Sequence, residues 1–247
     1  MIGREAGRLL AAASFLTRLP VGRPRSEDEL GRSARYFPLV GAGVGALGVA
    51  VLLAAIAALP LVVAVILSVV ATALVTGALH EDGLADTCDA LGGGRTREET
   101  LRILQDPRIG AYGALGLFLA VALKISALAY LPLALLPAAL VCAHAASRAA
   151  CVALIAFGTY ARAEGGKARP VAHGARSIDA VVALVIGVAP FALAPFTFLW
   201  ALPGVLALTV GLYAWFRARL GGYTGDCLGA TQQLTEIACY LAFLAVL

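Results

Sequence analysis

Residues 38–79 read PLVGAGVGALGVAVLLAAIAALPLVVAVILSVVATALVTGAL, and this stretch contains no charged side chain. It consists of two apolar runs, 38–59 and 61–79, joined directly at Pro60. At a rise of about 1.5 Å per residue, about 20 residues of α-helix cross the hydrocarbon core of a bilayer. The stretch therefore predicts two membrane-spanning helices with a short, uncharged turn between them.

The composition of the whole chain indicates the same environment. Of the 247 residues, 61% are hydrophobic and only 14% are charged, whereas about a quarter of the residues of a soluble domain are charged. A soluble core of this length could not bury so much apolar surface, so the solvent must be lipid. We therefore predict an all-α, polytopic integral membrane bundle that forms a single domain over residues 1–247.

Further apolar runs bring the prediction to about seven spans. The additional runs cover residues 111–131, 132–157, 178–200, 203–216 and 234–247. The last two are short and would have to tilt or lie against neighbouring helices. Near the N-terminus, the run 9–16 is short and is flanked by arginines, which is typical of an interfacial amphipathic helix rather than of a cleaved signal peptide.

The polar segments between the spans predict the orientation of the chain. Uncharged joins at Pro60 and at residues 131–132 and 202–203 return the chain to the side that it left, so the long polar segments share one side. They hold 17 of the 19 lysines and arginines, which places them in the cytoplasm by the positive-inside rule. These segments are 1–37, 80–110, 158–177 and 217–233.

Function is therefore expected at the cytoplasmic face of the membrane, with 80–110 and 217–233 as active-site loops. All 15 acidic residues lie in or next to the polar segments, so we expect no carboxylate deep in a span. The net charge is only +4, and no basic run with interleaved aromatic residues occurs, which argues against nucleic acid as a partner. The five cysteines form no C-x-x-C pair, which argues against structural zinc.

The segment HEDGLADTCDA, residues 80–90, is the most informative polar stretch. On a helix, Asp82, Asp86 and Asp89 stand at positions i, i+4 and i+7, within an arc of roughly 60°. Three carboxylates on one stripe repel one another, and the repulsion is stronger beside a low-dielectric bilayer. A divalent cation relieves this repulsion, and carboxylate oxygens are the ligands that Mg²⁺ or Mn²⁺ prefers. The stripe therefore predicts a metal site.

A second polar loop, GGYTGD at residues 221–226, is expected on the same side. Its glycines allow backbone N–H groups to turn toward an anion such as phosphate, so Gly222, Thr224 and Gly225 are candidate phosphate contacts. Asp226 could complete the metal site, and Glu236 is a weaker candidate. Together with the acidic stripe, the loop resembles the second wall of a phosphate site.

Three basic residues outside the segments 80–90 and 221–226 also require an explanation. Arg108, in the segment DPRIGAYG at 106–113, could bind either a phosphate or lipid headgroups. Arg148 follows His144 and Ser147 inside a span, and an intramembrane arginine costs enough free energy to suggest function. Lys124 suits snorkelling or a structural ion pair. The residues alone thus favour a Mg²⁺-assisted phosphoryl-type transfer at the cytoplasmic boundary.

These segments together resemble the cobalamin synthase family, the adenosylcobinamide-GDP ribazoletransferases. The pattern D-G-L-A-D-T-x-D followed at a distance by G-x-T-G-D is specific in combination, although neither half is specific alone. Gln105 stands where the family often has a basic residue. The blocks that carry the resemblance are FLTRLP (15–20), YFPLVG (36–41), HEDGLADTCDAL (80–91), DPRIGAYG (106–113), SR (147–148) and GYTGDCLGA (222–230).

The resemblance implies a bacterial or archaeal plasma membrane and a reaction there between adenosylcobinamide-GDP and α-ribazole or its 5′-phosphate. A ribazole hydroxyl would attack the phosphate that carries cobinamide, GMP would leave, and Mg²⁺ would be required. The oligomeric state stays open, a homo-oligomer being one alternative. The implied roles are metal ligation by Asp82, Asp86, Asp89 and Asp226, general base catalysis by Glu81 or His80, and phosphate contacts from Arg18, Arg108 and Arg148.

Two other functions compete with this interpretation. A CDP-alcohol phosphotransferase also places carboxylates around a D-G-x-x-A core, but it expects Arg where this chain has Asp86, and continued helix where Gly92, Gly93 and Gly94 follow. A divalent-metal transporter expects ionisable groups at mid-membrane along a path, and the carboxylates here are expected on one side only.

Overall fold

The computed structural model of the chain describes residues 2–22, 24, 26–161 and 168–247. In these ranges all regular elements are helices. An isolated β-bridge also joins Tyr160 and Tyr223. Several helices are long and apolar enough to span a membrane. The predicted all-α membrane bundle is therefore confirmed.

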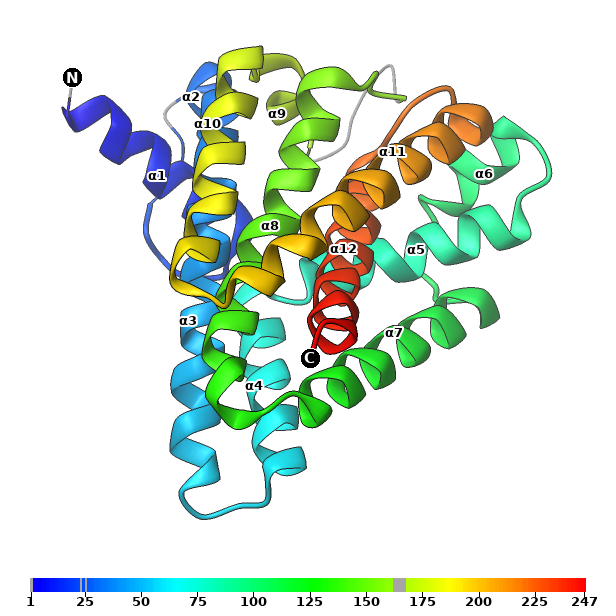
Figure 1. The fold of residues 1–247 in the computed structure, drawn as a ribbon. Coiled ribbons are helices and arrows are strands. Elements are labelled where there is room, and N and C mark those ends of the chain that lie inside the picture. The colour runs from blue at the N-terminus through cyan, green and yellow to red at the C-terminus, as the bar shows by residue number, and fades with distance from the viewer. Residues whose placement is uncertain (1, 23, 25, 162–167) are drawn as a thin grey trace.

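The helices follow one another along the chain as Figure 1 shows. The first half contains α1 (Ile2–Leu16), α2 (Glu27–Ser33), η1 (Ala34–Tyr36), α3 (Phe37–Ile56), α4 (Leu61–Thr76), α5 (Leu79–Gly93), α6 (Arg97–Ile103) and α7 (Ala111–Tyr130). The second half contains η2 (Leu133–Leu135), α8 (Leu136–Phe157), α9 (Arg169–Gly174), α10 (Ser177–Val188), η3 (Ala189–Leu193), η4 (Phe196–Trp200), α11 (Ala201–Leu220) and α12 (Gly225–Ala245).

Four continuous helical stretches pass the length and hydropathy expected of a span, namely Glu27–Ile56, Ala111–Tyr130, Leu133–Phe157 and Phe196–Leu220. The pair α4 and α5 passes only if it is counted as one bent span, and Ser177–Leu193 is a shorter apolar stretch. The expected single span 178–200 is wrong, because Pro190 and Pro195 interrupt it. Proline lacks the backbone N–H that continues an α-helix. The short 3₁₀ helices η3 and η4 therefore take the place of a continuous α-helix there. The count of seven spans stays a prediction.

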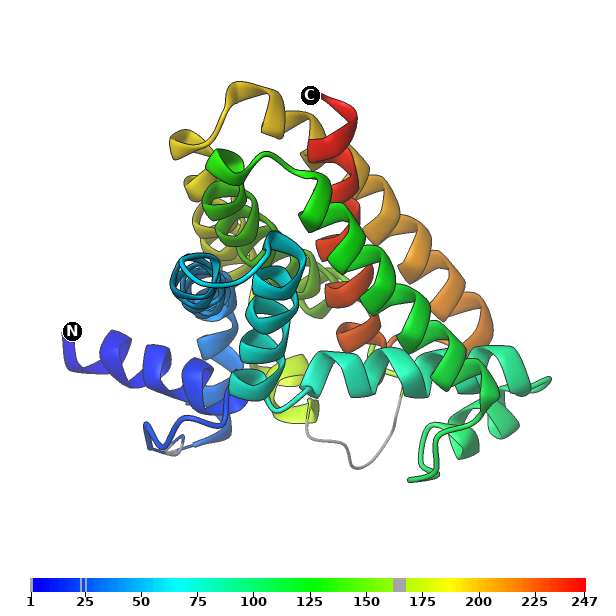
Figure 2. The ribbon, with the colours of Figure 1, turned by 90° about the horizontal axis from the view of Figure 1, so that it is seen from below.

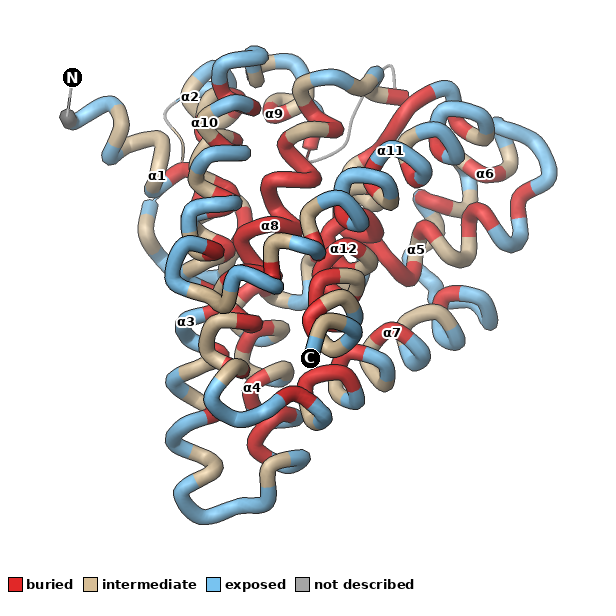
Figure 3. The backbone as a smooth tube through the Cα atoms, in the orientation of Figure 1, coloured by how far each residue is buried: buried red, intermediate tan, exposed pale blue. Residues whose placement is uncertain are grey.

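Helices α8 and α12 form the centre of the bundle. Figure 3 shows α8 buried along most of its length, with α3, α10 and α12 packed around it. Outward-facing apolar side chains on the surrounding helices, such as Leu74, Phe118, Val185 and Val210, are largely exposed. A surface of this kind is what a helix presents to lipid.

The chain turns sharply between α4 and α5. Gly77 (φ 66°) and Ala78 (φ 55°) both adopt the left-handed conformation, and the axes of the two helices differ by 89°. Gly77 is needed here because a Cβ atom would also meet the side chain of Arg18. The expected second span 61–79 therefore ends early, at Thr76, and the acidic stripe belongs to a separate helix that crosses the bundle (Figure 2).

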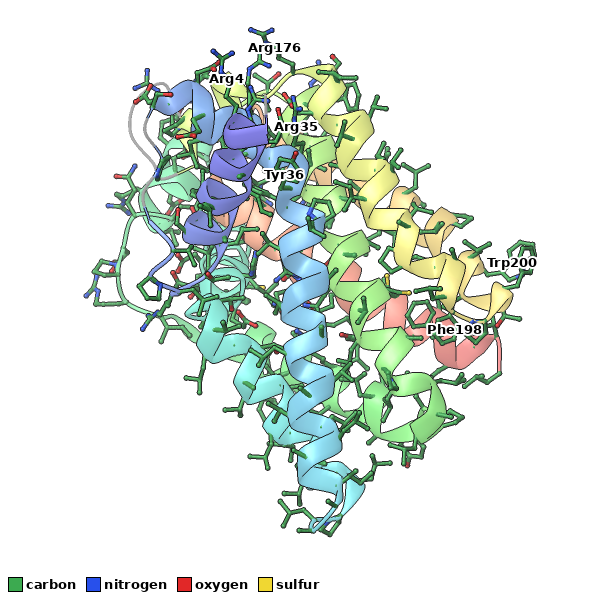
Figure 4. All side chains as sticks on the ribbon, turned by 90° about the vertical axis from the view of Figure 1, so that its left-hand side faces the viewer. Arg4, Arg35, Tyr36, Arg176, Phe198 and Trp200 are labelled. Carbon is green, nitrogen blue, oxygen red and sulfur yellow. The ribbon has the colours of Figure 1, made fainter. Side chains whose placement is uncertain are left out.

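The polar side chains gather at one end of the bundle. Figure 4 shows the nitrogen- and oxygen-bearing side chains around Arg4, Arg35, Tyr36 and Arg176, while the opposite end of α3 carries carbon only. At the polar end, Arg35 pairs with the fully buried Asp179 and joins η1 to α10. The helix expected near residues 9–16 is present as α1; its interfacial position stays a prediction.

Candidate active site

A cavity of about 280 Å³ lies where α1, α3, α5, α8 and α12 meet. Three of its lining residues are aromatic, namely Phe15, Phe37 and Tyr160. Its polar lining combines two carboxylates with a guanidinium and an imidazole, from Asp82, Asp226, Arg148 and His80. The structure thus joins both polar motifs of the sequence and the arginine inside α8 in one cavity.

The two carboxylates meet because α5 and α12 touch backbone to backbone. A Cβ atom built on Gly83 would lie 2.8 Å from the carbonyl oxygen of Asp226 and 3.1 Å from the Cα atom of Gly229. Only glycine at both positions permits this approach. The crossing therefore holds Asp82, which precedes Gly83, beside the first turn of α12.

We expect Gly83→Ala to loosen this crossing and destabilise the protein by about 1–3 kcal/mol, the usual effect of overpacking a close contact. The matched control is Gly93→Ala on the same helix, where a Cβ atom would lie at an ordinary 3.5 Å from the Cδ1 atom of Ile103. Thermal unfolding in detergent measures both variants. Equal unfolding midpoints for the two would contradict the close crossing.

The acidic stripe is helical, as predicted, but its members have different surroundings. Asp82 lines the cavity and Asp86 lies one turn further along α5. Asp89 accepts hydrogen bonds from the backbone N–H groups of Gly110 (2.7 Å) and Gly113 (2.8 Å) at the start of α7. No group of three or more His, Cys, Asp or Glu side chains in the described ranges is arranged as a metal centre.

The loop before α12 is shaped by contacts with the chain around Thr159. A Cβ atom on Gly222 would collide with the carbonyl of Thr159, and Tyr223 N–H donates a 2.9 Å hydrogen bond to that carbonyl. Thr224 is fully buried, and its hydroxyl accepts a 3.4 Å hydrogen bond from the Cys227 N–H as the N-cap of α12. Of the three predicted phosphate contacts in this loop, only Gly225 lines the cavity.

The three predicted arginine contacts lie in different places. Arg148 lines the cavity and is 2% exposed. The side chain of Arg108 is 85% exposed and donates to Asp106 at 2.9 and 2.7 Å. These hydrogen bonds lower the pKa of the Asp106 carboxyl to about 2. Arg18 packs against Gly77 at the bend between α4 and α5. The structure therefore brings only Arg148 to the carboxylates.

The two predicted general bases also separate. His80 lines the cavity. Glu81 instead accepts a 3.0 Å hydrogen bond from the Nε2 atom of Gln233, and its second carboxylate oxygen is buried with no hydrogen-bond partner in the described part of the chain. Of the two, His80 is therefore the one placed at the cavity.

Beneath the cavity lies a buried polar network that the sequence did not reveal. Glu236, which the sequence placed within about a turn of the polar segment 217–233, is 1% exposed inside the bundle. Helix α12 begins at Gly225, before the expected 234, so Glu236 occupies its middle. Glu236 pairs with Lys124 at 2.9 Å. Lys124 could have indicated this network from the sequence, since a buried ammonium group requires a carboxylate partner.

Comparison with known proteins gives one consistent match. The family model described as Cobalamin-5-phosphate synthase matches residues 8–244. The adenosylcobinamide-GDP ribazoletransferase of Leptothrix cholodnii is 47% identical over 98% of this chain and 96% of its own length. Those of Ralstonia pickettii and Shewanella frigidimarina are 45% and 40% identical, over 96% and 98% of this chain and 94% and 96% of their own lengths.

No solved structure matches the chain. The family match covers almost the whole length and includes every residue that lines the cavity. The chain therefore belongs to the cobalamin synthase family and is a membrane-embedded transferase of cobalamin biosynthesis.

Proposed function

We propose that the chain joins adenosylcobinamide-GDP to α-ribazole, or to its 5′-phosphate, with release of GMP. The hydroxyl oxygen of the ribazole forms a bond to the phosphorus that carries cobinamide. The bond from that phosphorus to the GMP oxygen breaks, and the hydroxyl proton passes to a base. The observation that carries the proposal is the cavity in which Asp82, Asp226 and Arg148 converge.

The donor set of this cavity fits Mg²⁺. Asp82 and Asp226 supply carboxylate oxygens from two different helices, and Asp86 stands one turn along α5. Oxygen ligands of this kind, few in number, suit a Mg²⁺ that also contacts substrate phosphates. When bound, the ion neutralises charge on the diphosphate. Asp89, the remaining ligand expected from the stripe, already accepts two backbone hydrogen bonds from α7.

The other residues of the cavity have matching roles. Arg148 offers guanidinium N–H groups to a phosphate, and the first turn of α12 around Gly225 adds the backbone N–H groups and dipole of a helix N-terminus. His80 would take the hydroxyl proton. The rings of Phe15 and Phe37 stack at 5.6 Å and form an apolar wall for a planar base.

The size of the cavity limits what it holds. Its volume of about 280 Å³ is at the lower end of ligand-binding pockets. A corrin ring with its adenosyl ligand is far larger than this. We therefore place the reacting phosphates and one nucleoside in the cavity, with the corrin outside it.

The test is release of GMP by the purified protein supplied with adenosylcobinamide-GDP and α-ribazole. We expect release to require both substrates, to stop when EDTA removes the divalent cation, and to resume when Mg²⁺ is added in excess. Omitting α-ribazole controls for hydrolysis of the nucleotide. If folded protein releases no GMP but transfers a CDP-activated lipid, the CDP-alcohol phosphotransferase interpretation replaces this one.

We further propose that the cavity faces the cytoplasm of the plasma membrane. Leu59→Cys and Arg95→Cys should then react with a membrane-impermeant maleimide from opposite sides. In right-side-out vesicles only the first variant is expected to label, and in inverted vesicles only the second. The unmodified chain controls for its own five cysteines, of which all but Cys88 are buried. Labelling of both from the same side would contradict the orientation.

A further inference from the structure

We propose that Lys124, Glu236 and His144, here called the relay, position the guanidinium of Arg148 for a substrate phosphate. The inference rests on the proposed function, because it assigns the phosphate to Arg148. The relay lies under the cavity and does not line it. Its members are therefore positioning residues rather than catalytic ones.

The state of Arg148 is the first observation. Its Nη1 atom donates to the carbonyl of His144 at 3.0 Å and lies 3.1 Å from the Nδ1 atom of the same residue. Its Nε atom is buried and has no hydrogen-bond partner in the described ranges. A buried guanidinium with an unused donor is unfavourable unless an anion completes it. Because Arg148 lines the cavity, that anion can come from a bound ligand.

The charge balance around Arg148 is the second observation. Within the described ranges, no carboxylate lies within ion-pairing distance of its guanidinium. The Nδ1 atom of His144 stands between Arg148 and Glu236, 3.5 Å from the Oε2 atom of Glu236. Glu236 is held in turn by Lys124 and by the Nε2 atom of Gln232, at 2.9 and 2.6 Å. The negative charge of Glu236 thus acts on Arg148 through one intervening imidazole.

This spacing has a consequence for binding. A carboxylate in direct contact with Arg148 would form a bidentate pair and occupy the donors that a phosphate needs. With no carboxylate nearby, the buried cation would be destabilised. The relay avoids both outcomes, because it supplies a counter-charge and leaves the Nε atom available. The packing of α3 fixes the path of the arm, since a Cβ atom on Gly41 would lie 2.5 Å from the Cδ atom of Arg148.

The test substitutes Glu236→Gln, which keeps the shape of the side chain and removes its charge. We expect the affinity for inorganic pyrophosphate, measured calorimetrically in saturating Mg²⁺, to fall at least about tenfold, since small misplacements of a binding group have effects up to about 100-fold. The KM for adenosylcobinamide-GDP should rise more than kcat falls. Tyr240→Phe is the matched control, because it removes a 3.2 Å hydrogen bond to the same carboxylate and keeps the charge.

A double variant separates positioning from folding. Glu236→Gln alone leaves Lys124 as a buried, unpaired charge, which should lower the unfolding midpoint. Adding Lys124→Met removes this second charge, so the midpoint of the double variant should return toward that of the unmodified protein. The pyrophosphate affinity should stay low, because no counter-charge then stands behind His144. Recovery of both properties in the double variant would overturn the proposal and leave the pair a purely structural role.

The outcomes also distinguish this inference from the proposed function. If the unmodified protein releases GMP and Glu236→Gln binds pyrophosphate as well as Tyr240→Phe does, only the relay is wrong. If the unmodified protein binds pyrophosphate through the relay but releases no GMP, the relay stands and the reaction is wrong. Absence of pyrophosphate binding in the unmodified protein would overturn the relay directly.

Discussion

Asp82→Asn is expected to reduce GMP release by about 100- to 1,000-fold, a loss typical of removing one electrostatic contribution to transition-state stabilisation. Asp82 is exposed and lines the cavity, and its carboxylate makes no hydrogen bond or ion pair with the described part of the chain. Its carboxylate is therefore available for Mg²⁺. Asparagine keeps the size of the side chain but removes the charge, so the fold should persist. Initial rates of GMP release in saturating Mg²⁺ measure the effect.

Two further substitutions make this result specific. Asp28→Asn removes an exposed carboxylate of α2, whose partner is Arg32 at 3.4 Å, and should leave the rate unchanged. Asp89→Asn should reduce the rate less than Asp82→Asn, because its carboxylate serves the start of α7 as a hydrogen-bond acceptor. Turnover of the Asp82→Asn variant near that of the unmodified protein would remove Asp82 from the metal site.

The spans could be predicted where hydrophobicity alone decides them. The expected runs 38–59, 111–131 and 132–157 correspond closely to α3, α7 and α8, because any helix of such composition must lie in lipid or in the bundle. The start of the last run was predicted wrongly because its environment is the inside of the bundle rather than lipid. Helix α12 is rich in polar residues that other helices satisfy, so a hydropathy pattern places its start too late.

The sequence predicted which motifs form the site, but not which partner each of their side chains contacts. Helical spacing places Asp82 and Asp89 about 10 Å apart along one helix, yet it does not show that the backbone at the start of α7 binds the Asp89 carboxylate. Likewise, Glu81 and His80 are adjacent in sequence, but only the packing of α12 shows that Glu81 contacts Gln233. Such contacts join residues far apart in the chain, so they are absent from any local pattern.

Arg148→Lys is expected to raise the KM for adenosylcobinamide-GDP by roughly 10- to 100-fold. The sequence offered Arg18, Arg108 and Arg148 as candidate phosphate contacts, and the structure separates them. Arg148 is buried beside the two carboxylates with an unused Nε atom. A lysine has no planar fork and cannot reproduce two parallel hydrogen bonds to a phosphate. Steady-state kinetics with α-ribazole held saturating measure the change.

Arg108→Lys provides the comparison, because it makes the same chemical change at the exposed arginine. Arg108 already donates to Asp106 through its side chain, and it lies on the loop before α7 rather than in the cavity. The KM of the Arg108→Lys variant for adenosylcobinamide-GDP should therefore stay close to that of the unmodified protein. An equal or larger rise in KM for Arg108→Lys would place the substrate phosphate on that loop. The buried Arg148 would then serve to stabilise the bundle, and the assignment of the cavity as the site of transfer would fail with it.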